Sequence, residues 1–193
     1  MFKNKFVKLG IAAAILIVVI YSLTMNTASY EEEILTSREE YETTLREMQP
    51  SPLAGSTNQI SYFDIDENWK ITVDFEEDIT TESFPVVMSD GSMEELHKAG
   101  IATFTKDGKE VSVTLFDEGE TFMLPFTDLL SGSETYGGGR YINIEKTNNN
   151  KLEIDFNKAH NFYCAYSEMF VCPVPPASNK INLQVAAGEK NFK

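Results

Sequence analysis

Residues 122–176 read FMLPFTDLLSGSETYGGGRYINIEKTNNNKLEIDFNKAHNFYCAYSEMFVCPVPP, and we take this stretch as the centre of the chain. It holds three consecutive glycines, both cysteines and one of the two histidines. Apolar and polar residues alternate over 152–157, as they do in a strand with one buried and one solvated face. The stretch therefore predicts β structure that carries a loop rich in unusual residues.

The same alternation continues on the N-terminal and C-terminal sides of this stretch. It recurs over 69–76, 111–115 and 181–185, and turn signals such as Asp107-Gly108 separate the runs. Asp-Gly between two apolar runs favours a tight hairpin. We count about nine strands and no strand–helix–strand spacing. An all-β domain over 51–193 is expected, built as an antiparallel sandwich or open barrel.

The N-terminus, residues 1–29, has the pattern of a membrane segment. Lys3, Lys5 and Lys8 precede an apolar run, and residues 6–25 are about long enough to cross a bilayer as a helix. The basic side is expected in the cytoplasm, which places the C-terminal domain outside. This predicts a single-pass membrane protein. The alternative is a cleaved signal peptide and a secreted or periplasmic domain.

An amphipathic helix is expected over 30–50. Ser29 and Glu32 form a capping box at its start, and Pro50 ends it. Four apolar residues fall on one stripe: Ile34, Tyr41, Leu45 and Met48. We interpret this segment as a helix that packs on the β domain.

The charge limits the possible partners. The chain has 30 acidic and 16 basic residues, a net charge of −14. Such a surface repels phosphate backbones, so nucleic acid is not an expected partner. The expected partners are the membrane, through the N-terminal segment, and a small molecule.

The glycine bend at 137–139 leads us to predict a ligand site. We expect residues 140–145 and 151–156 to form a hairpin that sets Ile144 opposite Leu152 and Tyr141 opposite Asp155. Arg140 would hold an anionic group and Asp155 would accept hydrogen bonds. The expected ligand residues are Tyr136, Gly137, Gly138, Gly139, Arg140, Tyr141, Asp155 and Asn157. The alternative is a glycine bulge that only bends a strand.

Cys164 and Cys172 have several interpretations. Outside the cytoplasm they could form a disulfide, and otherwise they could be buried thiols. A zinc site would add His160 and Asp155, but the sequence has no Cys-x-x-Cys pair. A nucleophilic Cys164 activated by His160 is the third reading. We expect no cofactor.

Several motifs resemble one known family. They are LPFTD at 124–128, ETYGGGRY at 134–141, DFNKA at 155–159, CAY at 164–166 and AGE at 187–189. Together they are similar to an uncharacterised bacterial family, domain-of-unknown-function family 1684, over roughly residues 30–190. The resemblance implies an exported or membrane-attached protein and no particular activity. The family pattern has Tyr at His160 and Pro at Phe162, so it implies no ligand role for His160.

The expected function is therefore that of a membrane-anchored extracytoplasmic β domain that binds a small anionic ligand. A hydrolase-type enzyme that uses Asp155, or a Cys/His metal centre, is the alternative. The sequence leaves open whether the protein is an enzyme.

Overall fold

A computed structural model describes residues 29–192 apart from 79, 81–82 and 148. The predicted anchor at 1–29 therefore lies outside the described residues, except for Ser29. In the described part of the chain, no helix combines the length and the apolar composition that a membrane crossing requires. The chain divides into two compact units, 1–36 and 37–193.

Helix α2 (Tyr30–Glu47) begins at the predicted cap. The backbone N–H of Glu32 donates to the Ser29 hydroxyl at 3.2 Å, which is one of the two bonds of a capping box. The helix ends before Pro50, slightly earlier than expected. From Ser37 onward it belongs to the second unit, where Leu45 packs with Leu53 and Ile60. This confirms the apolar stripe in that half of the helix.

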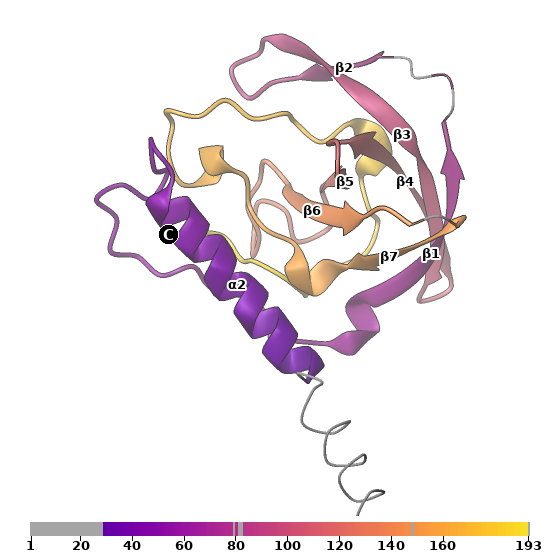
Figure 1. Cartoon of the computed structure of the whole chain (residues 1–193), viewed down its shortest axis with the longest axis horizontal. Helices are drawn as coiled ribbons and strands as arrows, with labels where there is room; N and C mark the ends of the chain where they lie inside the picture. The colour runs from indigo at the N-terminus through magenta and orange to yellow at the C-terminus, as the bar shows by residue number, and fades with distance from the viewer. Residues whose placement is uncertain (1–28, 79, 81–82, 148, 193) are drawn as a thin grey trace, which may run out of the picture. The chain divides into compact units, whose positions relative to one another are not determined.

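The β structure of the second unit is antiparallel. Its described strands are β1 (Lys70–Glu77), β2 (Ser83–Val87), β3 (Met93–Lys106), β4 (Lys109–Asp117), β5 (Thr121–Phe126), β6 (Arg140–Glu145) and β7 (Lys151–Asp155). Six run in the order β6-β5-β4-β3-β1-β7, and β2 pairs with β3. The end strands β6 and β7 lie side by side, so the sheet curls into a nearly closed barrel (Figure 1). The all-β prediction is confirmed.

The β3–β4 hairpin turns at Asp107-Gly108, as predicted. Both residues have positive φ, 51° and 71°, which is the backbone of the tight turn that matches strand twist. Lys106 and Lys109 face each other across it.

The predicted hairpin between 140–145 and 151–156 is wrong. Strand β6 pairs with β5, with Ile144 opposite Phe122, and β7 pairs with β1, with Leu152 opposite Val73. Local alternation cannot choose between partners with the same pattern, and β1 alternates as β7 does. Opposite charges also favour β1, because Lys70 lies 3.1 Å from Glu153.

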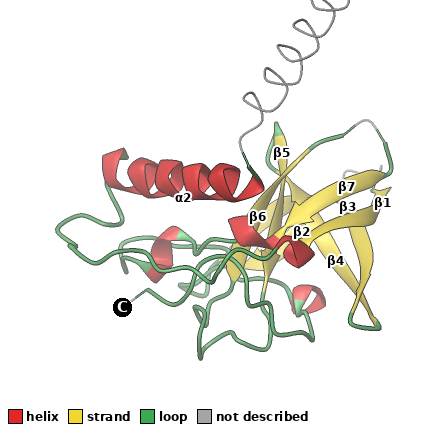
Figure 2. Ribbon diagram, turned by 90° about the horizontal axis from the view of Figure 1, so that it is seen from below, coloured by secondary structure: helices red, strands yellow, loops and turns green. Residues whose placement is uncertain are grey.

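Residues 181–185 do not form the ninth strand that we expected. Ile181, Leu183 and Val185 are buried while Asn182 and Gln184 are exposed, so the alternation reflects true burial. The backbone of Val185, however, bonds to the side chains of Asp128 and Arg140 and not to a neighbouring strand. Figure 2 shows the irregular loops of this unit gathered apart from the strands. Residues 181–185 therefore alternate between buried and exposed without forming a β-strand.

The core fills the barrel. Phe156 is fully buried at its centre, with its ring 5.4–6.0 Å from the rings of Phe126, Trp69 and Phe104. A smaller cluster lies on the other face of the sheet, formed by Val86, Phe116, Met123 and Tyr141. Strand β6 thus sends Ile142 and Ile144 inward and Tyr141 outward.

Candidate functional site

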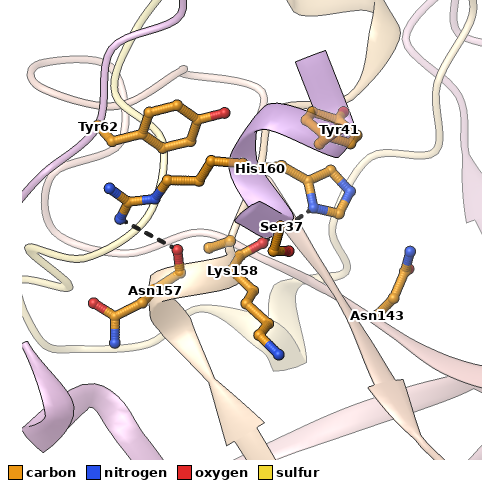
Figure 3. Close-up of a pocket in the computed structure, with 9 residues that line it drawn as sticks. Ser37, Tyr41, Tyr62, Asn143, Asn157, Lys158 and His160 are labelled. Carbon is orange, nitrogen blue, oxygen red and sulfur yellow. Dashed lines mark hydrogen bonds between the residues drawn. The ribbon is translucent and has the colours of Figure 1, made fainter. Parts of the chain in front are cut away.

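A cavity of about 160 Å³ lies beside the second half of α2 and the turn η2 (Phe156–Lys158) (Figure 3). Its lining consists of Ser37, Arg38, Tyr41, Tyr62, Asn143, Asn157, Lys158, Ala159 and His160. Two of these residues are cations and none is acidic. Two other cavities, of about 300 and 250 Å³, are each lined by carboxylates, Glu134 in one and Asp78 in the other. Of these three cavities among the described residues, the first is the one suited to an anion.

Arg38 is held in place at one side of this cavity. Its guanidinium lies 4.4 Å from the centre of the Tyr62 ring, which is cation–π distance. It also donates to the backbone oxygen of Asn157 at 3.4 Å, drawn as a dashed line in Figure 3. Burial raises the pKa of Tyr62, so its hydroxyl stays protonated at neutral pH. The positive charge is thus fixed before any ligand arrives.

His160 enters the cavity as a neutral ring. Its centroid lies 4.5 Å from that of Tyr41, and Tyr41 in turn donates its hydroxyl to the oxygen of Asn161 at 2.7 Å. Burial lowers the pKa of His160 to about 4. Its Nδ1 lies 3.3 Å from the oxygen of Lys158. A hydrogen on Nδ1 satisfies that oxygen and leaves Nε2 as an acceptor.

Asn157 is the predicted ligand residue that the structure brings to the cavity. Its side chain is engaged elsewhere: Oδ1 accepts from the N–H of Asp66 at 3.0 Å, and Nδ2 donates to the oxygen of Asp66 at 2.9 Å. Asp155 accepts from the Asn157 N–H at 3.0 Å and so caps η2. Both side chains therefore shape the turn that presents Lys158, and the Asp155 carboxylate caps this turn.

Arg140 has a role that the sequence did not suggest. Its side chain is 1% exposed and donates to three backbone oxygens of the C-terminal segment, those of Val185 (2.9 Å), Ala187 (2.5 Å) and Glu189 (3.2 Å). It also lies 3.4 Å from Asp128, whose carboxylate accepts from the N–H of Val185 at 2.8 Å. Burial lowers the pKa of Arg140 to about 10, which leaves it charged at pH 7. Its guanidinium thus holds the chain's own backbone.

The glycine bend lies against the cysteine- and proline-rich loop. A Cβ on Gly139, which has a φ of 92°, would come within 2.5 Å of Pro175 and 2.7 Å of the Phe126 oxygen. The hydroxyl of Tyr141 bonds to the oxygen of Pro173. These predicted ligand residues are therefore packed into the fold, and Gly137 is exposed beside them.

The cysteines and His160 do not meet. Cys164 and Cys172 are free thiols, and the backbone N–H of Cys164 donates to the sulfur of Cys172 at 3.1 Å. The ring of His160 contacts Tyr41 and the Lys158 oxygen, and its backbone pairs with that of Tyr141. Among the described residues, no group of three or more His, Cys, Asp or Glu side chains is placed to hold a metal.

Sequence reasoning missed Arg38, Tyr62 and Lys158 as cavity residues. One signal was available. Arg38 falls between Ile34 and Tyr41 on the apolar stripe of the helix, where a solvated cation is out of place. A charged residue within an apolar stripe indicates a candidate binding site. Nothing in the sequence indicates that Tyr62 and Lys158 lie near Arg38.

Comparison with known proteins gives the family. A profile described as protein of unknown function (DUF1684) matches residues 56–190. The chain belongs to this family. The fold is similar to the solution NMR structure of the uncharacterized protein from gene locus rrnAC0354 of Haloarcula marismortui, with a TM-score of 0.68 and 30% identity. The match covers 83% of this chain and 94% of that one. No curated protein matches.

Proposed function

We propose that this DUF1684 domain is a binding module for a small oxyanion, held in the cavity beside α2. The observation that carries the proposal is the presence of Arg38 and Lys158 at one cavity without a lining carboxylate, on a chain with a net charge of −14. The sequence alone favoured Arg140 for the anion. We assign this role to Arg38 instead, because Arg38 lines the cavity and Arg140 does not.

The size and the polar groups define the ligand further. A volume of about 160 Å³ equals roughly five water molecules at about 30 Å³ each. It fits one phosphate or carboxylate group, or that part of a longer molecule. Arg38 supplies a positive charge at the cavity wall, held over the Tyr62 ring, and Nε2 of His160 accepts a hydrogen bond from a hydroxyl. The preferred ligand therefore carries both an anionic oxygen and a hydroxyl, as hydrogen phosphate and hydroxy acids do.

Titration with inorganic phosphate tests this function. Lys158→Gln is expected to weaken phosphate binding at least about tenfold, because a charge-assisted hydrogen bond in a partly buried site contributes about 1.5–3 kcal/mol. Lys180→Gln is the matched control, since Lys180 is an exposed lysine that does not line the cavity. Isothermal titration calorimetry of the full chain measures both. Equal affinities for the two variants, or a wild-type chain that binds neither phosphate nor a hydroxy acid, contradict the proposal.

We further infer that residues 1–29 hold the domain at the outer face of a membrane. The support is the order of charges, with lysines before the apolar run and acids after it. Full-length chain is expected to stay in the membrane fraction after alkaline carbonate washing and to be digested by protease added outside intact cells. Release by the wash, or protection from the protease, would exclude this orientation.

A further inference from the structure

The two thiols and Tyr136 form a cluster apart from the cavity. The Cys172 sulfur accepts the N–H of Cys164 at 3.1 Å, so the two residues are adjacent although eight positions separate them. Cys172 and Tyr136 both lie close enough to the Cys164 thiol to lower its pKa. Sulfur, sulfur and phenol thus meet at one place on the cysteine- and proline-rich loop.

The two cysteines differ in exposure and in support. Cys172 is 1% exposed and tied to Ser89: its N–H donates to the Ser89 hydroxyl at 3.0 Å, and its oxygen accepts from the Ser89 N–H at 2.8 Å. Cys164 is partly exposed, in the short turn η3 (Tyr163–Ala165). The cluster therefore offers one accessible sulfur beside one fixed and protected sulfur.

Gly138 positions Tyr136 in this cluster. A Cβ at Gly138 would come within 2.4 Å of the Tyr136 ring, so only glycine lets that ring fold back over the bend. The glycines that we first read as an anion cradle thereby place a phenol beside a thiol.

We propose that Cys164 and Cys172 are a redox-active dithiol that undergoes exchange with small disulfides, with Cys164 as the attacking and Cys172 as the resolving sulfur. The arrangement of an exposed sulfur next to a protected one is what such exchange requires. A structural disulfide needs no such difference in exposure.

The Cys164 thiolate attacks one sulfur of a disulfide R–S–S–R, which forms the mixed disulfide Cys164–S–S–R and releases one RS⁻. Cys172 loses its proton and attacks the Cys164 sulfur, which forms the Cys164–Cys172 bond and releases a second RS⁻. The two protons from the cysteines end on the two RS⁻ groups. The cysteines are oxidised by two electrons, and the external disulfide is reduced to two thiols.

The ionisation of Cys164 supports this order. The hydrogen bond from Cys172 lowers the pKa of Cys164 to about 7, against the opposing effect of burial. The same hydrogen bond raises the pKa of Cys172. A thiol that is half ionised at neutral pH is the better attacking group.

Trapping with oxidised glutathione tests the proposal on the reduced full-length chain. Because the chain has only two cysteines, each single variant leaves one identified thiol. Wild-type protein is expected to form an internal disulfide, release two glutathione thiols per chain and retain none by intact mass. Cys172→Ser should retain one glutathione on Cys164. Cys164→Ser should retain none over the same time, because Cys172 is buried.

Several outcomes would overturn the proposal. If both single variants retain glutathione equally, Cys164 and Cys172 do not have different roles. If glutathione stays on the wild-type chain, Cys172 does not resolve the mixed disulfide. An internal disulfide that reduced glutathione cannot reopen would be a structural bond. In the Cys172→Ser variant, retention should be abolished when iodoacetamide is added first.

Tyr136→Phe separates reactivity from folding. With Tyr136 present, Cys164 should be alkylated about threefold faster at pH 7 than a free cysteine, since its larger thiolate fraction outweighs its lower nucleophilicity. Removing only the phenol hydroxyl should shift the pH midpoint of alkylation upward while the circular dichroism spectrum stays unchanged. An unchanged midpoint would remove Tyr136 from the site.

Discussion

Replacing Arg140 with alanine is expected to lower the free energy of unfolding by about 3–5 kcal/mol, because it leaves the buried Asp128 carboxylate without its positive partner. Three backbone oxygens of the C-terminal segment also lose their donor. Urea unfolding followed through the fluorescence of Trp69 measures the loss. Trp69 is the only tryptophan and is buried in the core, so it reports on the barrel.

Two further variants separate charge from hydrogen bonding. Arg140→Lys keeps the charge but not the planar fork, so it should cost less than alanine and still be destabilising. The double variant Arg140→Met, Asp128→Leu removes both charges and should recover part of the stability, but not all, because the C-terminal oxygens stay unpaired. A neutral Arg140→Ala would show that the arginine does not secure this segment.

Strands β6 and β7 show which part of the fold the sequence could predict. Alternation predicts which residues of β6 and β7 face inward, because period-two burial is a local property. It cannot name the partner strand, because β1 presents the same pattern and complementary charges. The all-β class follows from the sequence, whereas the closure into a barrel and its strand order depend on contacts between segments far apart in the chain.

The side-chain contacts of Gly139 and Arg140 also could not be predicted from the sequence. The motif around Gly139 and Arg140 is conspicuous, yet it serves packing against Pro175 and the C-terminal backbone. A buried arginine that bonds to main-chain oxygens has no signature in its own sequence, because its partners lie 45–49 positions away.

The stability of the second unit should be nearly independent of pH where two buried groups titrate in opposite senses. Burial raises the pKa of Glu189 from its ordinary 4.5 to about 7, and burial lowers that of His160 from 6.5 to about 4. Between pH 4.5 and 6.5 the folded chain holds one proton more than the unfolded chain on Glu189 and one fewer on His160. The two contributions to the slope, each about 1.4 kcal/mol per pH unit, cancel there.

Single variants should separate these contributions. In Glu189→Gln only His160 remains, and the stability of this variant should rise by about 1.4 kcal/mol per unit from pH 4 to 6.5, because acid charges a histidine that the fold holds neutral. In His160→Gln only Glu189 remains, and stability should fall by a similar amount per unit from pH 4.5 to 7, as the unfolded chain alone has released that proton. Urea unfolding at several pH values gives both slopes.

Glu189 and His160, whose titrations give the opposite pH slopes, belong to one network of contacts. Glu189 accepts from the N–H of Asn161 at 2.8 Å and from the Tyr166 hydroxyl at 2.7 Å. Asn161 directly follows His160, and Tyr41 both stacks on His160 and donates to the Asn161 oxygen. Because Asn161 and Tyr41 connect the two groups, the double variant should be flat with pH but differ from the sum of the single variants at fixed pH. Flat pH profiles in both single variants would mean that folding shifts neither pKa, so the fold would not keep His160 neutral below its ordinary pKa of 6.5.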